Sequence, residues 1–163
     1  MDEDIYEKIL ASLESKGIRV VVDATKDLLL NVLKYHPFLI KPNNHELGEM
    51  FGTVCKTDED IVHYAKKLQE KGAVNVLISM AGDGAILITE DGQNIKMGTP
   101  KGKVVNSVGA GDSMVAGFIT GYIRGGNYEE ALKSGTAAGS ATAFSEGLAS
   151  LEMYEKMLKQ ITE

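Results

Sequence analysis

The segment from Lys103 to Ala116, KVVNSVGAGDSMVA, combines small residues and one acid in a pattern that suits phosphoryl transfer. We predict a strand that stops at Asn106 or Ser107, a turn through Val108 to Ala110, and a helix that begins near Gly111. The first N–H groups of a helix lack intrahelical partners and carry the positive end of its dipole. This turn is therefore a candidate anion hole.

Asp112 lies at the mouth of the predicted anion hole. A carboxylate repels a phosphate, but it suits a base that accepts the proton of an attacking hydroxyl. Gly109 and Gly111 remove side-chain bulk, so that the helix dipole and the backbone amides neutralise charge on the transferred group. A structural explanation stays open, in which the glycines allow close helix packing and Asp112 favours the helix dipole.

Three motifs give the chain a resemblance to the ribokinase-like PfkB carbohydrate kinase family. The string GAGD at Gly109 to Asp112 resembles the family's second signature, KPNNHEL at Lys41 to Leu47 resembles its N-x-x-E segment, and SMAGDGA at Ser79 to Ala85 resembles its nucleotide loop. The resemblance implies that Asp112 is the catalytic base and that Gly109, Ala110 and Gly111 form the anion hole.

Two segments have amino-acid sequences most similar to those of the family members that phosphorylate fructose 1-phosphate: NSVGAGDSMVAGF and FLIKPNNHELGEMFG. This resemblance implies ATP-dependent phosphoryl transfer that yields fructose 1,6-bisphosphate, with ATP and Mg²⁺ as cofactors and a phosphorylated ketohexose as acceptor. One alternative is a tagatose-6-phosphate kinase. The other is a half-kinase that binds nucleotide or assembles with another chain and catalyses nothing alone.

Asn43 and Glu46 have two interpretations. Asn43 is a plausible N-cap, and Glu46 three residues later completes a capping box, which accounts for both residues without a ligand. The resemblance instead puts both near magnesium and the phosphates, where Glu46 would act on the metal through its water shell. Magnesium retains several waters, so one carboxylate of this kind suffices.

The candidate nucleotide loop also has two interpretations. Its two glycines between apolar runs predict a hairpin, whereas the resemblance makes the loop an ATP contact, with Ala81 where the family usually has glycine. The loop residues are Ser79, Met80, Ala81, Gly82, Asp83 and Gly84. The resemblance further implies ATP contacts from Thr136 and Gly139, although small residues spaced four apart in this region indicate close helix packing.

Apolar periodicity predicts an α/β fold around these motifs. Buried strands are predicted at Ile18 to Val22, Phe38 to Lys41 and Val74 to Met80, each delivered by a helix, in the order αβαβααβ. Such runs are typical of a mostly parallel sheet covered by helices on both faces. Ile86 to Thr89 and Gln93 to Met97 predict an antiparallel hairpin at its edge, and the resemblance implies the ribokinase-like fold.

Asp23 follows the first predicted strand. Open α/β sheets bind ligands at the carboxyl ends of their strands, which makes Asp23 a candidate ligand contact. It is equally suited to cap the helix predicted across Lys26 to Leu33.

Composition excludes several other classes of protein. The 163 residues carry a net charge of −6 and no basic stripe, which argues against nucleic acid as a general partner. Cys55 is the only cysteine, which excludes an internal disulfide and a multi-cysteine zinc site and predicts a reducing cytoplasm. The acidic amino terminus predicts neither a signal peptide nor a membrane anchor.

The resemblance covers this whole chain but only the carboxyl-terminal half of the family's usual length. Residues 1–163 therefore correspond to the nucleotide-binding portion, without the amino-terminal sugar-binding half and its β lid. Missing neighbouring strands would leave an open sheet edge, which predicts association, for example as a homodimer.

Overall fold

The computed structural model describes residues 5–13 and 16–162, which form two compact units. The first unit comprises Met1–Ser79 and Ile86–Asn94, and the second comprises Met80–Ala85 and Ile95–Glu163. No helix within the described ranges is both long and apolar enough to cross a membrane.

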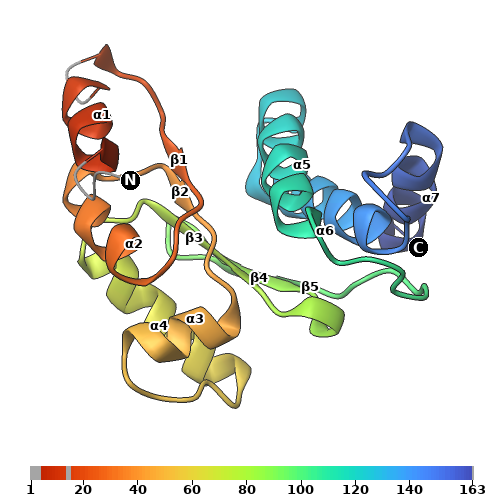
Figure 1. Cartoon of the computed structure of the whole chain (residues 1–163), viewed down its shortest axis with the longest axis horizontal. Helices are drawn as coiled ribbons and strands as arrows, with labels where there is room; N and C mark the ends of the chain where they lie inside the picture. Colours follow the sequence, from red (N-terminus) through yellow and green to blue (C-terminus); the bar gives the residue numbers. More distant parts are fainter. Residues whose placement is uncertain (1–4, 14–15, 163) are drawn as a thin grey trace. The chain divides into compact units, whose positions relative to one another are not determined.

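The first unit alternates helices with the strands of a parallel sheet, in the predicted order (Figure 1). Its elements are α1 (Ile5–Leu13), β1 (Val21–Val22), α2 (Lys26–Val32), the 3-10 helix η2 (Leu33–Tyr35), β2 (Leu39–Ile40), α3 (Asn44–Met50), α4 (Asp58–Glu70) and β3 (Asn75–Ser79). Helices α3 and α4 both contact β3.

Strand pairing confirms the predicted parallel sheet. Val21 of β1 pairs with Leu39 of β2, and Leu39 pairs with Asn75 of β3, both in parallel register. The five strands lie in the order β1-β2-β3-β4-β5, where β4 is Ala85–Ile88 and β5 is Asn94–Met97. The short β4–β5 connection forms the predicted hairpin at the sheet edge.

Strands β2, β3 and β4 form because their side chains are buried on both faces. In β2 and β3, Leu39, Ile40 and Leu77 are fully buried, which is the environment that β-branched and aliphatic runs favour. The predicted strand from Ile18 is shorter in the structure and begins at Val21. Ile18 is 53% exposed, because β1 lies at the end of the sheet order.

Three helices dominate the second unit: α5 (Ala110–Gly125), α6 (Tyr128–Ala143) and α7 (Leu151–Thr162) (Figure 1). Helices α5 and α6 pack closely, since a Cβ atom added at Gly117 would lie 2.6 Å from the Ser134 carbonyl oxygen. Met157 of α7 packs against Ala137 and Ala141 of α6. Close packing by the small residues of these helices is thereby confirmed.

The strand predicted before α5 is wrong. Residues 103–108 form no strand, and Val104 is 62% exposed, because the Val105 N–H donates to the Ala143 carbonyl instead of a sheet partner. Helix α6 ends at Ala143. Helix α5 begins at Ala110, in agreement with the predicted start near Gly111.

Candidate active site

The amino terminus of α5 presents unpaired backbone donors. Gly109 is its N-cap residue, with a φ of +79° that favours glycine and with no side-chain cap bond. The Ala110 N–H donates to Ser107 O (3.2 Å) and the Ser113 N–H to Gly109 O (2.9 Å). The N–H groups of Gly111 and Asp112 have no hydrogen-bond partner within residues 5–13 and 16–162. These donors lie at the positive end of a 16-residue helix, where an anion is favoured.

Asp112 lies in the first turn of α5 and is exposed. Its carboxylate makes no hydrogen bond or ion pair with any described residue. Its oxygens are therefore available to accept a proton from a hydroxyl brought to the helix terminus. The structure thus places an exposed carboxylate beside unpaired backbone donors.

The loop before α5 is fixed to the end of α6. The N–H groups of Val105 and Asn106 both donate to Ala143 O, at 2.8 and 3.2 Å. The Asn106 side chain accepts the Val108 N–H at 3.0 Å and donates to Glu146 O at 3.1 Å. Hydrogen bonds therefore set the path of this irregular loop, which explains why it needs no strand neighbour.

Asn43 and Glu46 form the predicted capping box at the start of α3. Asn43 Oδ1 accepts the N–H groups of His45 (2.9 Å) and Glu46 (2.8 Å), and Glu46 Oε2 accepts the Asn43 N–H (2.9 Å). In the described part of the chain, Asn43 Nδ2 and Glu46 Oε1 have no partner. The cap therefore leaves one amide donor and one carboxylate oxygen for a ligand.

The structure brings Ser79 next to the Asn43 cap. Ser79 ends β3, forms an isolated parallel bridge with Asn43, and donates its N–H to Pro42 O at 3.2 Å. Asn43, Glu46 and Ser79 thus lie together at the carboxyl edge of the parallel strands, where open α/β sheets bind ligands. Among the described residues, no group of three His, Cys, Asp or Glu side chains could hold a metal ion.

The remaining loop residues form a tight turn in the second unit. The 3-10 helix η3 (Ala81–Asp83) is exposed, and the Met80 N–H donates to Gly84 O at 2.8 Å. Ala81, at the position where the resemblance expects glycine, has a φ of +48°, which is unfavourable for a residue with a Cβ atom. Gly84 approaches the Met97 carbonyl too closely for any side chain. The turn therefore has the backbone conformation of a glycine-rich loop.

Of the two interpretations of Asp23, the structure excludes the one in which Asp23 caps α2. Thr25 is the N-cap residue of α2, whereas Asp23 Oδ2 lies 3.3 Å from Lys41 Nζ. The pairing of Val22 with Ile40 makes these residues neighbours at the carboxyl edge of β1 and β2. Lys41 is only 8% exposed, and sequence reasoning missed it. The sequence feature that could have identified Lys41 is a lysine between a buried strand and a proline.

Thr136 and Gly139 are buried in α6. A Cβ atom added at Gly139 would lie 3.1 Å from Ala110 O, so this glycine allows the start of α5 to approach α6. Thr136 Oγ1 is buried without a hydrogen-bond partner in the described residues. Their role as nucleotide contacts stays a prediction.

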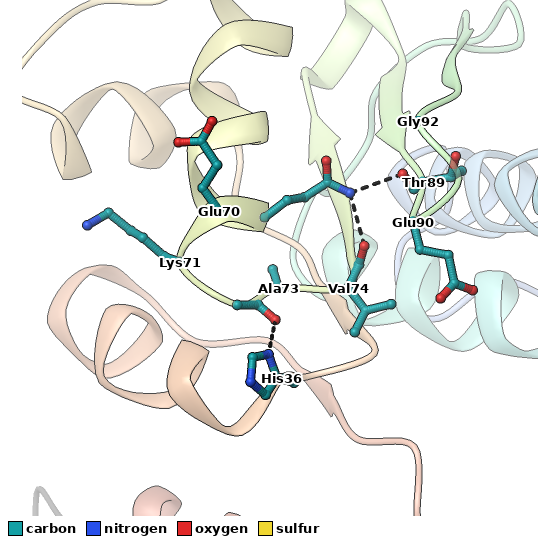
Figure 2. Close-up of a pocket in the computed structure, with 10 residues that line it drawn as sticks. His36, Glu70, Lys71, Ala73, Val74, Thr89, Glu90 and Gly92 are labelled. Carbon is teal, nitrogen blue, oxygen red and sulfur yellow. Dashed lines mark hydrogen bonds between the residues drawn. The ribbon is translucent and has the colours of Figure 1, made fainter.

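A cavity of about 470 Å³ lies elsewhere in the first unit, beside the residues that lead into β3 (Figure 2). His36 Nδ1 lies 3.1 Å from the Gly72 carbonyl oxygen. Gln69 Nε2 donates to the carbonyls of Val74 (3.0 Å) and Thr89 (3.1 Å). The His36 and Gln69 side chains thus bind backbone carbonyl groups and hold them in place. The cavity that they line is therefore not the candidate active site.

Comparison with known proteins shows the family of the chain. The model of the pfkB family of carbohydrate kinases matches residues 1–153. The chain is 48% identical to 1-phosphofructokinase from Bacillus subtilis, over 99% of this chain and 53% of that protein. It is 38% identical to D-tagatose-1-phosphate kinase from Bacillus licheniformis, over 98% of this chain and 52% of that protein.

Solved structures show the same fold. The crystal structure of phosphofructokinase-2 from Escherichia coli, in complex with substrates and products, superposes with a TM-score of 0.91 at 26% identity, over 100% of this chain and 54% of that one. That enzyme has also been solved in a tetrameric inhibited form. The chain therefore spans about half the length of the relatives it matches. The chain belongs to the PfkB family of carbohydrate kinases and has the predicted ribokinase-like fold.

Proposed function

We propose that residues 1–163 form the nucleotide-binding, carboxyl-terminal portion of an ATP-dependent kinase that converts fructose 1-phosphate to fructose 1,6-bisphosphate. The observation that carries this proposal is the α5 terminus, where an unpaired Asp112 carboxylate lies beside the free N–H groups of Gly111 and Asp112. The identity to the Bacillus subtilis 1-phosphofructokinase supports the choice of acceptor.

In the proposed reaction, the acceptor hydroxyl oxygen forms a bond to the γ-phosphorus of ATP while the bond to the leaving ADP oxygen breaks. Asp112 takes the hydroxyl proton. The N–H groups of Gly111 and Asp112 stabilise charge on the transferred group, and the small residues Gly109 and Ala110 leave space for that group. Pre-positioned donors are effective here because they need no reorientation during the reaction.

Asn43 and Glu46 fit a role in binding Mg²⁺ and the phosphates. The Asn43 amide donor suits a phosphate oxygen, and Glu46 Oε1 suits a magnesium-bound water. When bound, Mg²⁺ would neutralise part of the phosphate charge. We assign ATP to the loop from Ser79 to Gly84, with Thr136 and Gly139 of α6 as further contacts.

Two alternatives remain. The Bacillus licheniformis relative acts on D-tagatose 1-phosphate by its name, which favours a phosphorylated tagatose as the second acceptor, whether the 1-phosphate or the expected 6-phosphate. The other alternative is a half-kinase that binds nucleotide or pairs with another chain, including a second copy. The single free thiol, Cys55, supports a reducing cytoplasm as the setting.

The test is ADP release by the folded 163-residue chain with Mg²⁺, ATP and each of fructose 1-phosphate, tagatose 1-phosphate and tagatose 6-phosphate. We expect turnover with fructose 1-phosphate and a loss of about 10²–10⁴-fold in Asp112→Asn, with ATP affinity unchanged. Asp27→Asn is the matched control, since Asp27 is also an exposed acid in the first turn of a helix. Full turnover in Asp112→Asn would refute the assigned base, and ATP binding without turnover would favour the half-kinase.

A further inference from the structure

Thr142, in the last turn of α6, links three segments of the second unit. Its side-chain oxygen donates to Ser113 Oγ at 2.8 Å and accepts the Ala149 N–H at 3.3 Å. Its methyl group lies beside the N-cap residue of α5, since a Cβ atom added at Gly109 would be 4.0 Å from Thr142 Cγ2. Thr142 is 1% exposed, so water does not compete for these contacts.

Both α5 residues that Thr142 reaches define the anion-binding turn. Ser113 donates its own N–H to Gly109 O at 2.9 Å, which closes the first turn of α5. Gly111 and Asp112 lie between them in the chain and carry the free N–H groups. Holding Ser113 from α6 therefore restricts the direction of the donors and of the Asp112 backbone.

The cap of α5 makes this external support necessary. Gly109 provides no side-chain cap bond, unlike Asn43 and Thr57, which cap α3 and α4 through their own oxygens. A first turn without a capping side chain frays more readily, because capping residues contribute to helix stability. Thr142 bonds the Ser113 hydroxyl from another helix, so it supports the first turn of α5 without occupying the free N–H groups.

We propose that Thr142 is a positioning residue for phosphoryl transfer. Its hydroxyl holds Ser113, and with it the first turn of α5, in the geometry that binds the transferred phosphoryl group. This inference rests on the proposed function of the α5 terminus. It concerns a residue 29 positions away from Ser113 that lies outside the GAGD motif.

Three variants separate the hydroxyl from the packing. Thr142→Val keeps the shape and removes the hydroxyl, and Thr142→Ser keeps the hydroxyl and removes the methyl group. Thr120→Val is the matched control, because Thr120 is exposed and its hydroxyl donates only to Ala116 O within α5. Amide hydrogen exchange measured by NMR reports the first turn, and titration with inorganic phosphate and with Mg²⁺ and ATP reports anion affinity.

We expect Thr142→Val to accelerate exchange of the Ser113 N–H by about 5–10-fold and to weaken phosphate and ATP binding by a similar factor, which is the usual effect of one hydrogen bond. Exchange in the middle of α5 should stay within about 2-fold of wild type. Thr142→Ser should restore both values, and Thr120→Val should change neither. In a chain with turnover, Thr142→Val should lower kcat more than it raises KM.

Two results would overturn the inference. One is unchanged Ser113 exchange and anion affinity in Thr142→Val. The other is faster exchange throughout α5 and α6 that Thr142→Ser does not rescue, which is the signature of a purely structural role. Failure of the proposed anion site is distinct, because the wild-type chain itself would then bind neither phosphate nor ATP. ATP binding without turnover would instead favour the half-kinase and leave the anion site in place.

Discussion

Replacement of Gly117 by alanine tests how closely α5 and α6 pack. The added Cβ atom would lie 2.6 Å from Ser134 O and 2.7 Å from Ala138 Cβ. Non-bonded carbon atoms prefer separations of about 3.5 Å or more, so the helices must move apart locally by roughly 0.8 Å. The first of these atoms belongs to the backbone of α6, and no rotamer change can relieve that contact.

The expected loss of stability follows from two opposing effects. Overpacking of this kind costs about 1–3 kcal/mol, whereas alanine is favoured over glycine inside a helix by about 1 kcal/mol. Because the close contact is with backbone, we expect a net loss of about 1–2 kcal/mol for Gly117→Ala. Gly121→Ala should behave alike, since its Cβ atom would lie 2.6 Å from Glu130 O. The double variant should lose less than the sum, because one separation of the helices relieves both contacts.

Urea unfolding followed by circular dichroism measures these losses. Gly98→Ala is the control, since nothing lies within 4 Å of a Cβ atom added there, and it should stay within about 0.5 kcal/mol of wild type. A Gly117→Ala variant as stable as wild type would refute the close approach of α5 and α6. Fully additive losses in the double variant would refute the shared separation.

Three further predictions concern the turn, a cap and the buried ion pair. Ala81→Gly should raise stability by about 0.5–1 kcal/mol in thermal unfolding, because the φ of +48° disfavours alanine; a loss would contradict this backbone strain. Backbone hydrogen bonds, chiefly from Lys56, lower the pKa of Asp60 from its usual 3.8. The ionised Asp60 side chain therefore contributes fully to the free energy of unfolding above pH 3.8, and this contribution is lost as the pH falls below that value. The urea midpoints of wild type and Asp60→Asn should converge in acid, and a difference between the two midpoints that does not change with pH would contradict this. Asp23→Ala should cost about 1–3 kcal/mol in urea unfolding by leaving the buried Lys41 amine unpaired, and adding Lys41→Met should recover part of that loss.

The sequence was sufficient for features that depend on local chemistry. The capping box at Asn43 was readable because it is complete within four residues. The parallel sheet was predictable because strands buried on both faces have continuous apolar runs, as in Val76 to Ile78. The spacing of Gly117 and Gly121 likewise indicated close helix packing, which the contacts with α6 confirm.

Features that depend on distant partners were not predictable. Lys103 to Val105 have the residues of a strand, yet the Val105 N–H bonds the end of α6, 38 positions along the chain, and no strand forms. The pairing of Asp23 with Lys41 required the register of β1 and β2. The contact between Thr142 and Ser113 likewise joins two helices, and no periodicity of either helix encodes it.

The two candidate features at the carboxyl edge of the first unit differ in what stabilises them. The Asn43 and Glu46 pattern is stabilising without any ligand, because each side chain satisfies backbone donors of α3. Lys41 has no such local partner. Burial disfavours its positive charge, and Asp23, on the neighbouring strand's carboxyl side, provides its one described partner. The Lys41 charge therefore depends on the register of β1 and β2, whereas the capping box forms at the start of α3 alone.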